Sequence, residues 1–311
     1  MTKIAIIQEP PVVQDRAATL ARAVEQLEAA GSWAELVVFP ETYVPGYPAW
    51  IWRLRPGEDA PQTRELHARL VANAVRVDHG DLAPLCDAAA RHGVTVVVGF
   101  HELEENFGRS TLYNALAIIG PNGAILNRHR KLRPTNPERM VWGLGDATGL
   151  KVIDTPIGRL GALICWENFM PHSRFALYAQ GVEIYCAPTY DFGDGWIGSM
   201  QHIAREGRCY VLSAGCLLRA SDLPADLPAR DRLYPDPQEW INDGDSVVIA
   251  PGGRIIAGPL RRETGMLLAD LDLSVAALSR RSLDVTGHYA RPDIFQLSVD
   301  RRPRAPVVFE D

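Results

Sequence analysis

The chain lacks several features that would place it in a specialised class. Met1–Gln8 has no apolar core long enough for a signal peptide, and no stretch reaches the roughly 18 apolar residues that a membrane-spanning helix needs. The five cysteines include no Cys-x-x-Cys pair and no spacing typical of metal ligands. We therefore expect a soluble protein of the reducing cytoplasm, with no membrane partner and no metal site.

Charge of one sign is not in large excess either. Lys and Arg total 32 against 38 Asp and Glu, so the net charge is −6 and gives no global reason to expect nucleic acid as a partner. One basic run, Arg128–Arg133, could form a phosphate-binding patch. No second basic run supports that interpretation, and the net charge opposes it.

Linkers rich in serine or glycine and low-complexity segments are also missing. With 47% hydrophobic and 23% charged residues, the 311-residue chain has an ordinary globular composition and can bury a full core. We predict a single domain over residues 1–285. Residues 286–311 have little periodicity and a basic tail, and we predict that they form an arm that is ordered at a subunit interface.

The sequence does contain a regular alternation of apolar runs and helical patterns. The predicted strands are 3–8, 36–39, 94–100, 183–187, 210–216 and 266–271, and the predicted helices are 15–30, 81–92, 170–180, 196–205 and 274–281. Asp81 is the expected cap of the second helix, and the proline-rich segment 221–237 is an expected surface excursion. Hairpins are predicted at 112–127, 152–165 and 246–257. Hairpins among β-α units favour an α/β fold in which two mixed sheets pack face to face with helices outside.

Two strand ends carry residues that are suited to chemistry. The apolar strand pattern that begins at Arg159 ends abruptly in Cys165, beside a helix start where backbone N–H groups can stabilise a thiolate. A lone cysteine in a strand is more often a buried thiol that only packs. Glu41 directly follows another strand, where nearby apolar surface raises a carboxyl pKa toward the range of a general base. An isolated glutamate at such a position is more often solvated surface.

Three motifs together resemble the nitrilase superfamily of carbon–nitrogen hydrolases. Glu41 lies in Phe-Pro-Glu, Lys131 in His-Arg-Lys-Leu-x-Pro-Thr-x-x-Glu-Arg, and Cys165 in Cys-Trp-Glu-Asn. The similarity continues through segments 187–189, 202–209, 245–258 and 287–293, so it covers nearly the whole chain. The resemblance implies a four-layer α-β-β-α sandwich, in agreement with the predicted order of elements.

The resemblance also implies roles for individual residues. Cys165 would be the nucleophile and Glu41 the general base. Lys131 and the backbone N–H of Trp166 would stabilise the transition state, and Glu138 would be a supporting carboxylate. Glu167 and His129 would support the site without taking part in the chemistry. The residues expected to bind substrate are Trp166, Tyr47, Trp52, Thr189 and Tyr190.

Trp166, directly after the cysteine, resembles the true nitrilases, which hydrolyse an organic nitrile to the acid and ammonia through a thioimidate and an acyl-enzyme. An amidase, an N-carbamoyl hydrolase or a cyanide hydratase or dihydratase would use the same three residues. A binding protein that has kept the fold is a further alternative, and the intact motifs argue against it. The nucleophile belongs to the protein, so no cofactor is needed. The resemblance further implies self-association into dimers and larger spirals.

Overall fold

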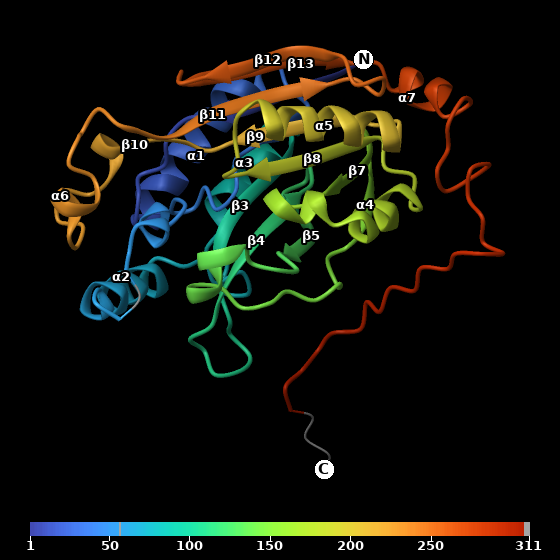
Figure 1. The fold of residues 1–311 in the computed structure, drawn as a ribbon. Helices are drawn as coiled ribbons and strands as arrows, with labels where there is room; N and C mark the ends of the chain where they lie inside the picture. The colour runs from blue at the N-terminus through green and yellow to red at the C-terminus, as the bar shows by residue number, and fades with distance from the viewer. Residues whose placement is uncertain (56, 308–311) are drawn as a thin grey trace.

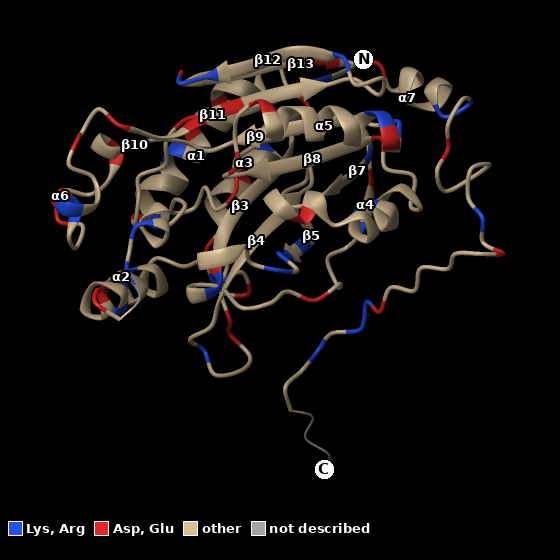
Figure 2. Cartoon of the chain, viewed as in Figure 1, with Lys and Arg blue, Asp and Glu red and all other residues tan. Residues whose placement is uncertain are grey.

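The chain folds into four layers, with two β-sheets packed face to face and a pair of helices on each outer side (Figure 1). The structure, a computed structural model, describes residues 1–55 and 57–307. Within that part of the chain, no helix is long and apolar enough to cross a membrane. Basic and acidic residues are interspersed along the visible elements, as Figure 2 shows. The expected α-β-β-α sandwich of mixed sheets is confirmed.

The first sheet has the strand order β13-β1-β2-β3-β4-β5. Its strands are β1 (Thr2–Gln8), β2 (Leu36–Val38), β3 (Thr95–Leu103), β4 (Leu112–Ile119), β5 (Ile125–Arg130) and β13 (Gly265–Leu271). The pairs β1–β2 and β2–β3 are parallel, and β3–β4, β4–β5 and β1–β13 are antiparallel. The middle of β1, Ile4–Ile7, and all of β2 are apolar because both of their faces are covered.

The second sheet has the order β10-β11-β9-β8-β7-β6, and β12 pairs with β11. Its strands are β6 (Val152–Thr155), β7 (Gly158–Ala162), β8 (Ile184–Thr189), β9 (Tyr210–Gly215), β10 (Leu217–Arg219), β11 (Trp240–Ile249) and β12 (Ile255–Arg261). Here β7, β8 and β9 run parallel, so their carboxyl ends meet at one edge of the sheet. Ligand crevices in open α/β sheets lie outside such edges.

Helices cover the outer faces of both sheets. The longer ones are α1 (Arg16–Gly31), α2 (Ala60–Ala72), α3 (Ala83–His92), α4 (Pro171–Tyr178) and α5 (Asp194–Gly207), and the short ones are α6 (Arg230–Leu233) and α7 (Leu273–Ser279). The carboxylate of Asp15 caps α1 by accepting the N–H of Ala18 at 2.9 Å. Gly93 ends α3 at a φ of 64°, a left-handed conformation that glycine adopts without strain. Three-residue to five-residue 3-10 turns lie at Ala49–Trp52, Asn136–Met140, Cys165–Phe169 and Ala220–Asp222.

Side chains alternate between the two faces of each strand, and this alternation divides the core into layers. In β1, Ala5 and Ile7 pack under α1 and α3, and Ile4 and Ile6 face the second sheet. The inter-sheet layer has aliphatic side chains from both sheets, among them Val38, Val97, Ile118, Leu160, Ile184, Leu212 and Val248. A third layer joins α4 and α5 to the outer face of the second sheet. The apolar contact between sheets holds together the strand ends that carry the site.

Several local predictions were wrong. Asp81 does not cap α3, which begins two residues later, because its carboxylate pairs with Arg16 at 2.9 Å and accepts the N–H of Arg76 at 2.9 Å. The strand expected to reach Cys165 ends at Ala162. β11 and β12 are longer than the hairpin predicted at 246–257, because polar residues such as Asp245 are buried in ion pairs.

Helices α2 and α6 were missed by the sequence analysis. α2 buries few side chains, chiefly Leu66 and Leu70, so its apolar periodicity is weak. α6 lies within 221–237, a segment that we expected to be a surface excursion. Residues 286–307 carry no helix or strand and run past α4 down that side of the molecule (Figure 1), where Val299 packs against the third core layer.

Candidate active site

Glu41 follows β2 and is fully buried. Its Oε1 accepts the Nζ of Lys131 at 2.8 Å and the amide of Asn114 at 2.7 Å, and its Oε2 accepts the backbone N–H of Tyr190 at 2.6 Å. Gly99 on β3 makes room for this segment, since a Cβ there would lie 2.5 Å from the backbone N of Thr42. The carboxylate is therefore fixed by three donors from separate parts of the chain.

Lys131 directly follows β5 and has no exposed side-chain surface. Its Nζ donates to Glu41 at 2.8 Å and to Glu138 at 2.9 Å. Its backbone N–H donates to the carbonyl of Asn114 at 2.7 Å, which continues the pairing of β4 with β5. The ammonium group lies between two buried carboxylates.

The surroundings of Lys131 also show whether the basic run Arg128–Arg133 forms a phosphate-binding patch. On β5 the side chains alternate, so that His129 points inward and is fully buried. Arg130 pairs instead with Glu102 at 2.6 Å and with Glu104 at 3.0 Å. Within this run His129 and Lys131 are buried and Arg130 pairs with acidic residues, so these side chains do not form a common basic surface.

Glu138 lies on the 3-10 turn Asn136–Met140, which it caps. Its Oε2 accepts the backbone N–H of Thr135 at 2.7 Å, in addition to its bond from Lys131. Its Oε1 accepts the hydroxyl of Tyr47 at 2.8 Å, and Trp52 Nε1 donates to the same hydroxyl at 3.1 Å. Glu138 thus connects the lysine to the aromatic residues near the site.

Cys165 begins the turn that follows β7 and is nearly fully buried. Its φ of 50° is left-handed, which costs about 1–2 kcal/mol for a residue with a Cβ. The amide of Asn168 holds the turn by donating to the Cys165 carbonyl at 2.7 Å, and the hydroxyl of Thr189 lies 3.4 Å from the Cys165 sulfur. Such strain persists only where the surroundings fix the conformation, and it is typical of functional sites.

The electrostatics favour a resting state with a neutral thiol. Burial, with the charge of Glu41, raises the pKa of Cys165 and outweighs the opposing charge of Lys131. Burial also raises the pKa of Glu41 above its ordinary 4.5, which Lys131 only partly opposes. Burial by itself lowers the pKa of Lys131, but the charges of Glu41, Cys165 and Glu138 outweigh it, and the net pKa is raised. Stabilisation of a thiolate by the backbone N–H groups of this turn stays a prediction.

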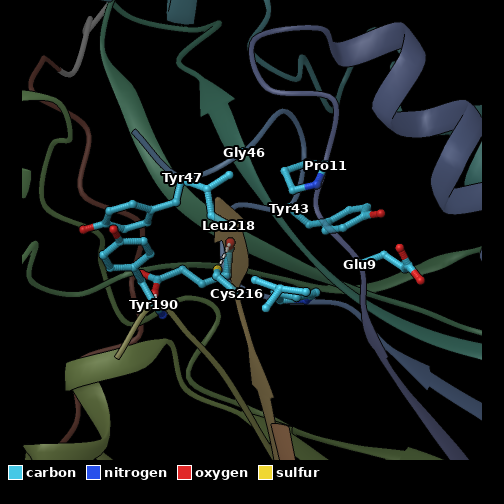
Figure 3. A pocket seen from close by; sticks show the side chains of 11 residues that line it. Glu9, Pro11, Tyr43, Gly46, Tyr47, Tyr190, Cys216 and Leu218 are labelled. Carbon is cyan, nitrogen blue, oxygen red and sulfur yellow. Dashed lines mark hydrogen bonds between the residues drawn. The ribbon is translucent and has the colours of Figure 1, made fainter. Parts of the chain in front are cut away.

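The residues expected to bind substrate lie around this cluster. The rings of Tyr47 and Tyr190 stack with centroids 3.6 Å apart, as the left side of Figure 3 shows. Trp52 and Trp166 are half-exposed, with 45% and 43% of their surface open to solvent. Trp166 Nε1 donates to Asp191 at 2.7 Å. Aromatic surface thus extends outward from the buried cluster.

A cavity of about 10 Å³, room for about one water molecule, lies next to Glu41 (Figure 3). Tyr47, Tyr190 and Cys216 line one part of it, and Tyr43 and Glu9 line the other. Among residues 1–55 and 57–307, no group of three or more His, Cys, Asp or Glu side chains is arranged to hold a metal ion.

Asn114 and Gly99 were missed by the sequence analysis. Asn114 stands in the apolar strand Leu-Tyr-Asn-Ala-Leu-Ala, and a polar residue at such a position signals a buried hydrogen bond. Gly99 directly follows three valines within an apolar strand, which signals a close approach of another backbone. Neither signal says which distant residue is the partner.

Comparison with known proteins gives the family. The model of the carbon-nitrogen hydrolase family matches residues 3–281. This chain belongs to that family. Nitrilase 2 of Arabidopsis thaliana is 41% identical and the alignment covers 99% of this chain and 91% of that protein. The aliphatic nitrilase of Sinorhizobium fredii is 39% identical, and the alignment covers 99% of this chain and 99% of that protein.

Solved structures agree on the fold. The carbon-nitrogen hydrolase from Helicobacter pylori superposes with a TM-score of 0.70 at 17% identity, covering 94% of this chain and 96% of that one. The NitFhit protein of C. elegans gives a TM-score of 0.71 at 21% identity, covering 98% of this chain and 68% of that one. The sandwich described above is therefore also the fold of these two proteins, the first of which is described as a carbon-nitrogen hydrolase.

Proposed function

We propose that this protein is a nitrilase that hydrolyses an organic nitrile to the carboxylic acid and ammonia. The observation that supports the reaction is the buried cluster of Glu41, Lys131 and Glu138, whose charges all act on the Cys165 thiol. The observation that favours nitriles over other substrates is the similarity to nitrilases over nearly the full chain.

The reaction begins with the neutral thiol. Glu41 takes the proton of Cys165 as the sulfur attacks the nitrile carbon, and the proton passes to the nitrile nitrogen, which gives a thioimidate. The raised pKa of Glu41 suits a group that must hold a proton briefly and then release it. Lys131, which stays charged, stabilises the negative charge that develops on nitrogen.

Two water molecules complete the reaction. The first adds to the thioimidate carbon, and the C–N bond breaks to release ammonia and leave an acyl-thioester. The second hydrolyses the thioester, which releases the acid and returns the thiol. Glu41 can activate each water as a base, and Glu138 keeps Lys131 in place through the bond at 2.9 Å. The residues supply all of this chemistry, and the proposal requires no cofactor.

Release of the amide is the alternative outcome of the same intermediate. Some relatives at about 40% identity are described as bifunctional nitrilase and nitrile hydratase, among them one from Oryza sativa at 40%. If the tetrahedral adduct loses sulfur before nitrogen, the product is the amide. An amidase or an N-carbamoyl hydrolase would begin from the amide itself with the same three residues.

The experiment that tests the proposal measures ammonia release from a panel of aliphatic, aromatic and arylacetic nitriles and from the matched amides. Cys165→Ala should abolish release while the circular dichroism spectrum stays unchanged. Cys86→Ala, a half-buried thiol on α3, is the matched control and should keep the parent rate. Turnover retained in the Cys165 variant would contradict the proposal, and a preference for amides would contradict the nitrilase assignment.

We further propose that the protein associates with itself through α4 and the arm. A groove of about 870 Å³ lies between them and is lined mostly by apolar side chains, with Glu206 and Arg291 among the polar ones. Ile294 and Phe295 of the arm are 57% and 77% exposed. Such apolar exposure is typical of an interface, and a second copy of the chain would cover it.

All five cysteines are free thiols, which supports the reducing cytoplasm as the location.

A further inference from the structure

The buried carboxylate of Glu167 joins the two segments that carry the ammonium and the thiol. Its Oε1 accepts the backbone N–H of Leu132, next to Lys131, at 2.6 Å. Its Oε2 accepts the backbone N–H of Ile164, next to Cys165, at 2.7 Å. One side chain therefore bonds the residue after the lysine and the residue before the cysteine.

His129, which lies on β5 two residues before Lys131, anchors this carboxylate. Its Nε2 lies 3.1 Å from both oxygens of Glu167, and neither side chain is exposed. Since a carboxylate only accepts, Nε2 carries the hydrogen. Burial acts to raise the pKa of Glu167, but the charge and hydrogen bond of His129 and the two backbone N–H groups outweigh it, so the pKa is lowered. Glu167 is therefore a carboxylate with both oxygens engaged.

The packing between the two sheets explains why the link through Glu167 matters to the site. Lys131 directly follows a strand of the first sheet, and Cys165 follows a strand of the second. The sheets meet through aliphatic side chains, whose attraction is not directional. A misplacement of about 1 Å costs about 100-fold in rate. Fixing the two segments to that tolerance requires a directional link, and Glu167 supplies one.

We propose that Glu167 is a positioning residue that sets the separation of the Lys131 ammonium from the Cys165 thiol, with His129 as its anchor. This inference rests on the proposed function. Glu167 touches neither the thiol nor the ammonium, so its effect on the reaction is through the two backbone segments.

The chemistry of glutamine makes a sharp test possible. In Glu167→Gln the single amide oxygen accepts one backbone N–H, and the NH₂ group faces the other, which is also a donor. The variant can therefore hold one segment and must release the other. Glu167→Asp keeps the charge but is one methylene shorter. His129→Gln retains a donor for Glu167, and His129→Leu removes it.

The control is Asp81→Asn. Like Glu167, the carboxylate of Asp81 accepts a backbone N–H, that of Arg76, but Asp81 lies just before α3, on the outer side of the first sheet. Three quantities are measured in each variant: kcat and KM for a nitrile, the rate at which acrylamide alkylates Cys165 by mass spectrometry, and the thermal midpoint. We expect Glu167→Gln to lose about 100-fold in kcat with KM changed by less than about threefold. Asp81→Asn should keep the parent kcat.

The two histidine variants provide the rescue test. His129→Leu should resemble Glu167→Gln, and His129→Gln should recover about tenfold of the loss, because it restores the donor. They also replace Glu167→Gln if that variant does not fold. A purely structural role would make kcat follow the thermal midpoint in all variants, Asp81→Asn included, and would overturn the inference. So would a Glu167→Gln enzyme with kcat within about threefold of the parent.

Alkylation of Cys165 separates this inference from the proposed function. If the parent protein hydrolyses no nitrile, the proposed function fails, but the alkylation rate still reports whether Glu41 and Lys131 are placed to activate the thiol. Slowing by about tenfold in Glu167→Gln, and not in Asp81→Asn, then supports the inference. Equal alkylation rates in the parent and Glu167→Gln overturn it.

Discussion

Lys131 Nζ lies 2.8 Å from Oε1 of Glu41, and neither side chain is exposed to solvent. A buried ion pair of this kind recovers its desolvation cost only through close geometry and further hydrogen bonds. The amide of Asn114 and the carboxylate of Glu138 supply those further bonds. We interpret the pair as part of the proposed catalytic cluster rather than as a source of stability.

Removing the ammonium should nevertheless destabilise the fold, because it leaves two buried carboxylates unpaired. Lys131→Met should lower the free energy of unfolding by about 3–5 kcal/mol and abolish ammonia release. Urea denaturation at pH 7 measures the first effect. Arg91→Met, which breaks the exposed pair with Glu28, is the control and should cost about 0–1 kcal/mol. Equal losses in the two variants would contradict this account of the cluster.

The hydroxyl of Tyr47 should matter to the reaction because it orients Glu138. Tyr47→Phe removes the bond at 2.8 Å and should lower kcat about tenfold, in line with the loss of one hydrogen bond to a charged group. Tyr43→Phe is the matched control, since in the described part of the chain the Tyr43 hydroxyl has no hydrogen-bond partner. Figure 3 shows that it points away from Tyr47 and toward Glu9. A loss of activity of the same size in both variants would be evidence against a specific role for Tyr47.

The pH dependence of kcat/KM should follow Glu41. Its pKa is raised in the folded protein, chiefly by burial, so it is protonated at a higher pH than an ordinary glutamate. A protonated Glu41 cannot accept the thiol proton, and activity is therefore lost as the pH falls through this raised pKa. The acid limb should lie above pH 4.5, and circular dichroism at each pH separates it from unfolding. A limb at or below pH 4.5 in a folded enzyme would exclude Glu41 as the base.

The arm should contribute to association. A chain that ends at Val285 lacks the exposed apolar side chains of Tyr289, Ile294 and Phe295, and light scattering should give it a smaller mass than the full chain. A chain that ends at Asp300 keeps all three and should retain the parent mass. If both truncated chains keep the parent mass, the interface lies elsewhere on the molecule.

The sequence by itself determined the architecture, because alternating apolar runs, which are local properties of the chain, predicted the strands. The resemblance of three short motifs to a known family suggested Glu41, Lys131 and Cys165 as the site residues, and their roles remain a proposal. Local pattern was also the source of the errors. Asp81 looks like a cap, but its ion pairs with Arg16 and Arg76 prevail, and α2 was missed because it buries few apolar side chains.

Only the tertiary structure decided how the site residues meet. Asn114 and Gly99 act on Glu41 across neighbouring strands, and the bridge from Glu167 to Leu132 and Ile164 joins one sheet to the other. The raised pKa values of Cys165 and Glu41 depend on burial that no residue produces alone. Sequence specifies which groups are present, whereas their charges and contacts depend on distances between segments that are set only when the two sheets pack.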